Sequence, residues 1–554
     1  MHQASRTPRS SIYFDYQVYP AAERPAHPAH AKVVIAGAGL VGMATALELA
    51  RFDVPCVLLE SEQQVCEGSR AIVFTRRSME ILQQVGADKA VTAQGLPWRF
   101  GNSFYRGQRV FRMEAPYSND DRFFPMINLQ QQFLEEALVT LVQAQPLIEM
   151  RWGHKVIGVV DAGQSSGVAQ IGIDTPQGTY VQPAEHVVVC DGARSALRSL
   201  LNLKLEGSSY EGRFVIADIR IALPLPTERL AFFDPPWNPR NTVLMHREPL
   251  GIWRIDYQLP AGETPEEALA PESLRTRINA QLEMIGHGGT PWEMDWSSVY
   301  SARALTLPDY RHGRFLFAGD AAHMLPIFGV RGANTGFQDG QNLAWKLACV
   351  VNGLAPDHLL ASYSHERVAA AREIVEEAGK STRFMTPPTR GFRLLRDAVL
   401  SLSLTQEFVR PLYHWRTSRP HAYIDSPLNS PQDDNALFTA GPANGEPMAN
   451  VKLGEDHYVM DDFPAGFLLL LFGAAGGHHA DIVAAVTTLQ SSGVPIHVRL
   501  NADSAVRQKY GVAGNESDKV VAYLFRPDQH VCARWLSLTP SSLNAAVARA
   551  LGQP

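Results

Sequence analysis

The sequence predicts an α/β fold centred on a parallel β-sheet, and three neighbouring features support this prediction. Residues 33–36 form a short apolar run with β-branched side chains, which is typical of a buried parallel strand. A glycine-rich turn follows at 37–42, and an Ala- and Leu-rich stretch to about residue 51 favours a helix. Residues 56–59 form a second apolar run, which ends at Glu60. The order of strand, turn, helix and strand is that of a βαβ unit.

The glycine-rich turn has the G-x-G-x-x-G spacing of a dinucleotide-binding loop. In such a loop Gly37 permits the tight turn, Gly39 lets a pyrophosphate approach the backbone, and Gly42 lets helix and strand pack closely. The helix directs free N–H groups and its positive end at the phosphates. Glu60 lies where an acidic side chain accepts hydrogen bonds from a ribose, so we expect a dinucleotide site rather than a plain βαβ turn. The predicted contacts in this stretch are Gly37, Gly39, Leu40, Val41, Gly42, Glu60 and Ser61.

The composition restricts the class of protein and its partners. A chain of 554 residues has room for two or three domains. Its net charge of −6 gives no reason to expect nucleic acid or an anionic membrane as a partner. No apolar run approaches the roughly 18 residues of a membrane span, and the first residues lack the apolar core of a signal peptide. The cysteines include no C-x-x-C pair, so we expect reduced thiols in a cytoplasmic protein.

Two later apolar runs also end in turns with an acidic residue. The run 187–190 is followed by Asp191 and Gly192, and the run 315–318 leads into Gly319 and Asp320. We expect the second run to lie next to the strand that precedes Gly37. The three turns would then meet at the mouth of one parallel sheet.

Other elements near these turns are suited to bind an anion. A long helix is expected from about residue 338 to 351, behind a second glycine-rich turn that contains Gly332, Ala333 and Asn334. Arg70 follows the strand that ends at Glu60 closely enough to reach a phosphate, although a lone arginine is more often a surface residue. The glutamines 130–132 open another expected helix, which continues to about residue 143.

Alternating apolar and polar residues predict antiparallel strands at 151–180 and 213–259, whereas residues 98–125 are aromatic and read as irregular. Within 252–257 the alternation places Trp253, Ile255 and Tyr257 on one face. Most such aromatic residues simply pack a sheet. This face is nevertheless the best candidate in the sequence for the wall of a substrate cavity.

The C-terminal part reads as a separate unit. Residues 426–450 are rich in Pro, Asn, Asp and Gly and are expected to be a linker. The order expected beyond them (strand, helix, strand, helix, two strands, helix) is that of a thioredoxin-like domain. The turn at 473–477 has glycines where a redox domain needs its cysteine pair, so we expect no disulfide chemistry. His478 and His479 have no further ligands in this loop, so we expect no metal.

Taken together, the turn 37–42 with Glu60, Asp191-Gly192, Gly319-Asp320 and the C-terminal unit resemble the single-component FAD-dependent aromatic hydroxylases. Within that family the chain is similar to the 3-(3-hydroxyphenyl)propionate hydroxylase and phenol hydroxylase branch. The resemblance implies a Rossmann-like FAD-binding domain of the p-hydroxybenzoate hydroxylase type with an inserted β-sheet substrate domain. It also implies that NADH or NADPH reduces FAD, and that O₂ then gives a C4a-hydroperoxyflavin that hydroxylates a phenolic or aromatic-acid substrate.

The resemblance also implies roles for individual residues. Glu60 would hold the adenosine ribose and Arg70 the FAD phosphates. Gln131, or its neighbour Gln130, would approach the ribityl or pyrophosphate region. Asp191 would serve both FAD and the nicotinamide cofactor.

On the flavin side, Asp320 would contact the ribityl hydroxyls. The backbone of the stretch Gly332-Ala333-Asn334 would donate to the pyrimidine edge, where a helix N-terminus stabilises the negative charge of reduced flavin. The chain departs from the common family form at Pro326, where the family often has two prolines. A second departure is Arg331, in a stretch where many members have paired glycines.

Hydroxylation of a phenol also needs a group that assists deprotonation of the substrate. The candidates on the predicted sheet are His246, Asp256 and Tyr257. Each of them, taken singly, is more often structural than catalytic.

The expected domain order is an arm at 1–31, an FAD-binding domain over 32–425, a linker at 426–449 and a thioredoxin-like domain at 450–554. Within the second of these, about 32–100, 150–212 and 300–380 bind FAD, about 101–149 and 213–299 form the substrate sheet, and 381–425 is helical. We expect a cytoplasmic homodimer that acts on a small aromatic substrate. Two alternatives stay open: a flavin monooxygenase of the same fold that acts on a polyketide or antibiotic, and a flavin-binding interaction protein without turnover.

Overall fold

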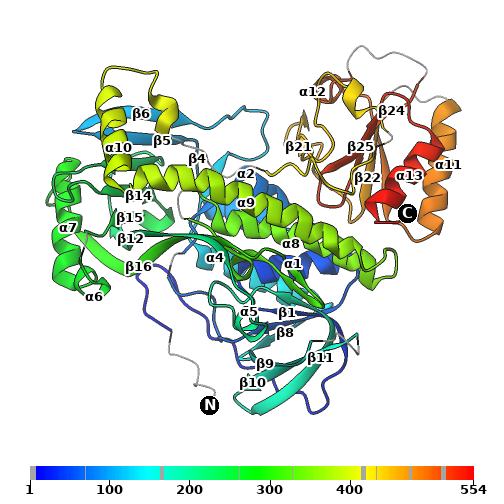
Figure 1. Ribbon diagram of the computed structural model, residues 1–554, viewed down its shortest axis with the longest axis horizontal. Helices are drawn as coiled ribbons and strands as arrows, with labels where there is room; N and C mark the ends of the chain where they lie inside the picture. Colours follow the sequence, from blue (N-terminus) through cyan, green and yellow to red (C-terminus); the bar gives the residue numbers. More distant parts are fainter. Residues whose placement is uncertain are drawn as a thin grey trace.

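The computed structural model describes residues 8–68, 70–162, 167–260, 262–326, 329–413, 420–431, 433–472, 477–512 and 519–553 (Figure 1). The side chains of residues 209–211, 302, 477 and 478 also lie outside this description. In the described part of the chain, no helix is both long enough and apolar enough to cross a membrane.

A largely parallel sheet, here called the central sheet, organises the first half of the fold. Its strands lie in the order β17 (Arg311–His312), β18 (Phe315–Phe317), β11 (Gly178–Val189), β1 (Ala31–Ala36), β2 (Cys56–Glu60) and β8 (Ile148–Trp152), with β10 (Ala169–Thr175) and β9 (Lys155–Asp161) continuing from β11. β1 pairs in parallel with β11 and with β2, so that Val34 lies opposite both Val187 and Val57. Helix α1 (Leu40–Arg51) connects β1 to β2, as the sequence predicts.

The strand that precedes Gly319 lies in the central sheet but not beside the strand that precedes Gly37. β11 lies between them, because it pairs in parallel with β1 on one side and with β18 on the other. The prediction that the two strands are neighbours is therefore wrong, whereas the prediction that they share one parallel sheet is confirmed. Since β1, β11 and β18 are parallel, their carboxyl ends meet at one edge.

Helices α1 and α8 (Gly332–Val351) approach each other closely beside the central sheet. A Cβ atom on Gly336 would lie 2.5 Å from Cγ2 of Val41, and one on Gly340 would lie 2.5 Å from Oγ1 of Thr45. A larger residue at either position would push the helices apart. Glycine therefore sets the distance between the helix after the first turn and the helix after the last one.

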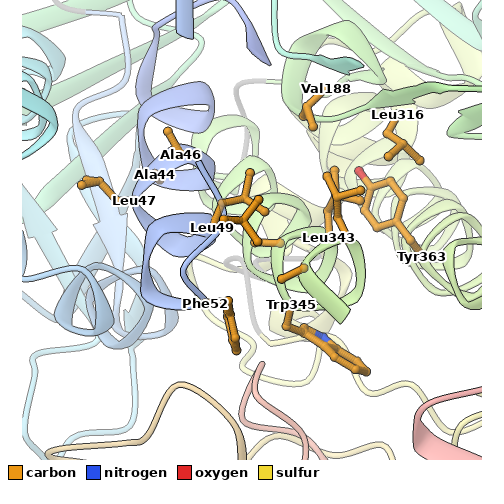
Figure 2. Packing of buried hydrophobic residues seen from close by; sticks show 14 of the residues in the cluster. Ala44, Ala46, Leu47, Leu49, Phe52, Val188, Leu316, Leu343, Trp345 and Tyr363 are labelled. Carbon is orange, nitrogen blue, oxygen red and sulfur yellow. The ribbon is translucent and has the colours of Figure 1, made fainter. Parts of the chain in front are cut away.

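Buried apolar side chains fill the space between these helices and the sheet. Figure 2 shows Leu49 of α1 and Leu343 of α8 close to Val188 of β11 and Leu316 of β18. Tyr363, from the long helix α9 (Leu359–Met385), joins them and donates its O–H to the Phe317 carbonyl at 2.6 Å. Helix α4 (Gln131–Ala144) also packs against α1.

A second sheet of eight strands lies beside this half. Its order is β19 (His323–Met324), β16 (Trp292–Thr306), β12 (Glu206–Ile221), β15 (Ile252–Gln258), β14 (Thr242–Arg247), β13 (Arg229–Phe233), β5 (Phe100–Tyr105) and β6 (Gln108–Glu114). The sheet extends on both sides of the segment 213–299 expected for it. The segment 101–149 was also expected in this sheet, but only β5 and β6 join it. Helix α4 of that segment packs against α1, and β8, which begins at residue 148, belongs to the central sheet. Residues 98–125 thus contain strands where the sequence read as irregular.

Helix α7 (Pro271–Met284), which follows the short α6 (Pro265–Ala268), covers one face of the second sheet. Trp253, Ile255 and Tyr257 lie on this face, at most 1% exposed, and pack in one cluster with Leu274 and Ile278 of α7. The prediction that they form a cavity wall is wrong, because the helix already fills that space.

The opposite face of the second sheet turns toward the central sheet. On this side Arg254 donates to the Arg70 carbonyl at 3.0 Å, and the Tyr300 hydroxyl donates to the Leu325 carbonyl at 3.1 Å. The remaining elements fill the junction and the edges: β3 (Val73–Thr75), β4 (Leu96–Trp98), β7 (Met126–Asn128), α2 (Arg76–Gln84), α3 (Asp88–Gln94), α5 (Ala196–Leu200) and α10 (Arg390–Leu402).

The C-terminal unit contains a four-stranded sheet, drawn from orange to red in Figure 1. Its order is β23 (Ile496–Asn501), β22 (Phe467–Phe472), β24 (Val521–Phe525) and β25 (Val531–Trp535), with the hairpin β20 (Lys452–Gly454) and β21 (His457–Tyr458) before it. β22 is parallel to β23 and antiparallel to β24. With α11 (Gly477–Ser491), α12 (Ser504–Lys509) and α13 (Pro540–Ala550), the element order is the predicted one. The turn at 473–476 and the His478 side chain lie outside the described residues.

A cluster of buried charges joins the C-terminal unit to the rest of the fold. In the turn between β24 and β25, Arg526 contacts Asp528 and donates to Glu366 of α9 at 2.6 and 3.1 Å. Lys346 of α8 donates to the same Glu366 at 2.6 Å. Although burial raises the pKa of Glu366, the charges of Arg526 and Lys346 hold it below its usual range. The segment expected to be a linker also packs on this unit, since Ser430 N–H donates to the Cys532 carbonyl at 2.8 Å.

Candidate cofactor and substrate site

The turn after β1 leaves room for an anion at the start of α1. Gly37 has φ +99°, and a Cβ there would lie 2.4 Å from the Cys190 carbonyl oxygen. A Cβ on Gly42 would lie 1.9 Å from the Gly37 carbonyl oxygen. At Gly39, by contrast, the nearest atom to an added Cβ is a Glu135 oxygen at 4.0 Å. Because α1 begins at Leu40 without a side-chain cap, its first N–H groups can serve a phosphate.

The three motifs found in the sequence meet at this turn. An added Cβ on Gly37 would lie 3.0 Å from the Asp191 Cα, and one on Gly319, where φ is +60°, would lie 3.0 Å from Cγ2 of Val41. Asp339 of α8 holds the last of these turns, since its carboxylate accepts from the Gly319 N–H at 3.0 Å. The expectation that the turns share the mouth of one sheet is confirmed.

Glu60, at the end of β2, is fixed by the backbone around it. Its Oε2 accepts from the Ala38 N–H at 2.8 Å, and its Oε1 accepts from the Ser61 hydroxyl and the Glu62 N–H, both at 3.0 Å. Oε2 accepts only one of these hydrogen bonds and keeps a second lone pair, so Glu60 can still accept from a ribose hydroxyl. Burial raises its pKa.

Two further carboxyl groups line the same edge. Asp191 Oδ2 accepts from the Leu197 N–H at 3.1 Å, while its Oδ1 is buried and has no hydrogen-bond partner in the described residues. Its neighbour Gly192 takes φ +78°. Asp320 has a solvent-accessible side chain. Desolvation by the surrounding protein raises the pKa of its carboxyl group.

The loop of residues 61–68 and 70–72, called here the 61–72 loop, lies beside these carboxyl groups. Cys66 N–H donates to Glu135 at 2.7 Å, and Ala71 N–H donates to Gln131 Oε1 at 2.9 Å, so α4 holds the loop at two points. Arg70 lies between these points with an exposed side chain. Its positive charge lowers the pKa of Asp320, although burial has the larger effect and raises it. The structure thus brings Arg70, Gln131 and Asp320 to one site.

The start of α8 is held by the side chain of Asn334. Its Oδ1 accepts from the Thr75 N–H at 2.9 Å and from the Ser78 hydroxyl at 2.6 Å, and its Nδ2 donates to the Val73 carbonyl at 2.9 Å. The side chain is thus engaged by β3 and α2, so the backbone of the stretch 332–334 is what this helix start offers a ligand. Pro326 is buried beside it, and residues 327 and 328 lie outside the described part of the chain.

On the face of the second sheet that turns toward Arg70, His246 and Asp256 lie on neighbouring strands. His246 is opposite Arg254 in the register, and Leu244 is opposite Asp256. His246 Nδ1 and Asp256 Oδ1 are buried without a hydrogen-bond partner among the described residues. Burial raises the pKa of Asp256 to about 7. Burial, followed by the charges of Arg229 and Arg254, holds the pKa of His246 well below its usual value.

This pair has the chemistry of a proton-handling site. A carboxyl group with a pKa near neutrality can exchange a proton at physiological pH, and a neutral imidazole can donate or accept a hydrogen bond. Arg254, by contrast, is occupied by two hydrogen bonds to Asp218, at 2.9 and 3.1 Å. Tyr257, the third candidate base, does not join the pair: it lies on the opposite face, 5.6 Å from Trp237 between ring centroids.

Gln130, the alternative to Gln131, donates instead to the Pro249 carbonyl at 3.2 Å. Sequence reasoning missed Gln132 and Asp339. Gln132 donates to the Tyr13 hydroxyl at 2.8 Å, so the three consecutive glutamines contact three different parts of the chain. Asp339 joins His323 at 2.6 Å to the Gly319 turn. The only signal for these residues was polarity at the start of a helix or within it.

A family model described as "FAD binding domain" matches residues 30–378, which is more than half of the chain. The chain belongs to this FAD-binding family. FAD is therefore the cofactor of this chain. The residues at the site described above suit it: free helix N–H groups, an open position at Gly39 and carboxyl groups for hydroxyls.

Curated relatives of this FAD-binding protein are named as hydroxylases. One is the 3-(3-hydroxy-phenyl)propionate/3-hydroxycinnamic acid hydroxylase of Mycolicibacterium smegmatis (strain ATCC 700084 / mc(2)155), which is 27% identical over 80% of this chain and 77% of the relative. The sequence resemblance to the FAD-dependent aromatic hydroxylases is thereby confirmed.

Solved structures share the fold. The flavin-dependent monooxygenase PieE, in complex with FAD and substrate, has a TM-score of 0.78 at 22% identity and covers 95% of this chain and 100% of its own. The rebeccamycin biosynthetic enzyme RebC with reduced flavin has a TM-score of 0.73 at 22% identity, with coverage of 95% and 100%.

Proposed function

We propose that this protein is an NAD(P)H-dependent FAD monooxygenase that hydroxylates a phenolic or aromatic-acid substrate. The observation that carries the proposal is the pair His246 and Asp256, which is buried and incompletely hydrogen-bonded on the sheet face that contacts Arg70. Buried polar atoms without partners are costly, so they mark a place where a ligand supplies the missing hydrogen bonds. A phenolic hydroxyl has the donor and acceptor that this pair lacks.

In this proposal the chain's own residues hold FAD from both ends. The turn Gly37–Gly42 and the first N–H groups of α1, at Leu40 and Val41, bind the pyrophosphate, and Glu60 with Ser61 binds the adenosine ribose. Arg70 and Gln131 close the phosphate side, and Asp191-Gly192 and Gly319-Asp320 address the ribityl chain. The N–H groups of Gly332, Ala333 and Asn334 would donate to the pyrimidine edge, and Pro326 would lie near them.

Bound FAD supplies the redox chemistry, with NADH or NADPH as reductant and O₂ as oxidant. The protein positions the aromatic ring and moves the proton. Asp256, with a pKa near 7, accepts the phenolic proton, and His246 orients the hydroxyl. The packed second sheet keeps water away from the reacting atoms.

We further propose that residues 450–554 form a thioredoxin-like domain without redox function. Its support is the strand order β23-β22-β24-β25, with one parallel and two antiparallel pairs. Cys532 is buried, and burial raises the pKa of its thiol to about 12, which makes it a poor nucleophile. We expect the domain to support assembly of a homodimer in the cytoplasm, with residues 32–425 carrying the chemistry.

A screen of phenols and aromatic acids tests the function. NADH and NADPH oxidation, product mass and peroxide release are measured together with the FAD-loaded protein. We expect at least one aromatic compound to accelerate NAD(P)H oxidation and to gain one oxygen atom. If no aromatic compound changes the oxidation rate and none is hydroxylated, the protein is a flavin-binding interaction protein instead.

A second candidate function is hydroxylation of a larger polyketide-like or antibiotic phenol. The fold likeness to PieE and RebC over 95% of the chain favours it. The same screen, extended to polycyclic phenols, distinguishes the two substrate classes by which one couples NAD(P)H oxidation to product rather than to peroxide.

A further inference from the structure

Residues 8–30, called here the arm, precede nearly all of the segment matched by the FAD-binding family and run along the surface as an extended chain. One part of the arm is anchored on the second sheet. Arg9 pairs with Asp295 of β16 at 2.5 Å, and the Ser11 hydroxyl and the Ile12 N–H donate to the same carboxylate at 2.7 and 2.8 Å. Arg220 of β12 donates to the Ile12 carbonyl.

The other part of the arm is anchored on the FAD-binding half. Tyr19 exchanges hydrogen bonds with Gln63 at 2.7 and 2.9 Å, stacks on Trp152 of β8 at 4.5 Å between ring centroids, and donates to Glu136 of α4 at 2.5 Å. Ala22 N–H donates to the Trp152 carbonyl at 3.0 Å. The arm therefore joins the second sheet to the central sheet.

Between these anchors the arm contacts the 61–72 loop directly. The Tyr16 hydroxyl accepts from the Gly68 N–H at 2.9 Å, and Arg9 lies over the Tyr16 ring at 5.7 Å. Gly68 has φ +75°, and an added Cβ there would clash with Trp296 at 2.3 Å, so the loop is pressed between the arm and the second sheet. Arg70 follows two residues later. A contact from outside the family-matched segment thus adds to those from Arg254 and Gln131 that hold this loop.

We propose that the arm is a clasp that holds the 61–72 loop closed over FAD, with Tyr16 as the positioning residue, and that it sets the rate of FAD release. Release of FAD past Arg70 requires the loop to move. Because the arm is fixed at both ends, movement of the loop breaks the Gly68–Tyr16 hydrogen bond as well as the bonds to α4. The inference depends on FAD binding and not on the substrate, so it stands or falls separately from the proposed hydroxylation.

The test compares FAD release from the FAD-loaded full-length protein and its variants. The recovery of free-FAD fluorescence after dilution gives the dissociation rate without reference to activity. We expect Tyr16→Phe to release FAD about fivefold faster, which corresponds to one net hydrogen bond. Asp295→Ala, which frees the arm from its anchor on the second sheet, should release FAD about tenfold faster or more. The double variant should be no faster than Asp295→Ala, because both changes open the same clasp.

Tyr19→Phe is the matched control. It also removes one tyrosine hydroxyl of the arm, but that hydroxyl contacts α4 and not the 61–72 loop, so we expect release within twofold of the wild-type rate. Melting curves of the apoproteins identify any variant that is poorly folded. The proposal is overturned if Tyr16→Phe releases FAD at the wild-type rate, or if Tyr19→Phe accelerates release as much as Tyr16→Phe does. Should Asp295→Ala fold poorly, the two tyrosine variants decide alone.

Discussion

Replacing Asp256 by Asn tests the electrostatics of the substrate face. Burial raises the pKa of Asp256 from 3.8 to about 7 in the folded protein. Between these two values the unfolded chain has lost the proton while the folded protein keeps it, so the free energy of unfolding falls as pH rises. At about 1.36 kcal/mol per pKa unit, the loss reaches about 4 kcal/mol by pH 7 and is constant above it.

The Asn variant has no such loss, because its amide does not titrate. Its free energy of unfolding relative to the wild type should therefore increase by roughly 3 kcal/mol between pH 5 and pH 7 and then stay level. Denaturant midpoints measured from pH 5 to pH 8.5 on both proteins check this expectation. Asp120→Asn, at an exposed position, is the control and should follow the wild-type pH dependence.

The reasoning is refuted if the free energies of unfolding of Asp256→Asn and the wild type differ by the same amount at every pH. Such a result would mean that Asp256 has the same pKa in the folded protein as in the unfolded chain. In the proposed hydroxylation the same substitution removes the proton acceptor. Turnover should then fall by about 10²–10⁴-fold while FAD stays bound.

Three further predictions concern the cofactor turn and the C-terminal unit. Gly42→Ala should abolish FAD binding, measured by flavin absorbance of the purified protein, because the added Cβ would lie 1.9 Å from a backbone carbonyl oxygen. Arg526→Ala should lower the free energy of unfolding by about 3–5 kcal/mol, because it removes one of the buried cations that pair with Glu366. The control is Arg410→Ala, at an exposed ion pair, which should lower it by less than about 1 kcal/mol. Equal effects of the two arginine variants would contradict the buried cluster. Cys532→Ser should leave turnover near the wild-type value; loss of turnover with FAD content and stability intact would mean that the C-terminal unit takes part in chemistry.

Much of the cofactor site was predictable from the sequence because its determinants are local. A β-branched run, a glycine turn and a helix-forming stretch each restrict only neighbouring residues. The steric demands at Gly37 and Gly42 arise within one turn and the strand beside it. The acidic turns at Asp191 and Asp320 were identified in the same way, because parallel strands bring their carboxyl ends to one edge wherever they lie in the sheet.

Tertiary structure alone decided which strands are neighbours and which faces are covered. The period of two along β15 shows that Ile255 and Tyr257 share a face, but only the packing of α7 decides that this face is closed and that Asp256 lies on the face toward Arg70. Likewise, the sequence showed that β1 and β18 are parallel-strand candidates, but it carried no information that β11 lies between them.

The contacts of the arm are the clearest case of information that the sequence lacked. Tyr16 and Gly68 are 52 positions apart, and neither belongs to a motif that points to the other. Their hydrogen bond exists because Asp295 and Trp152 fix the two ends of an otherwise extended segment. A local pattern predicts a turn or a helix because the forces act between near neighbours, whereas a contact of this kind depends on where the whole chain has placed both partners.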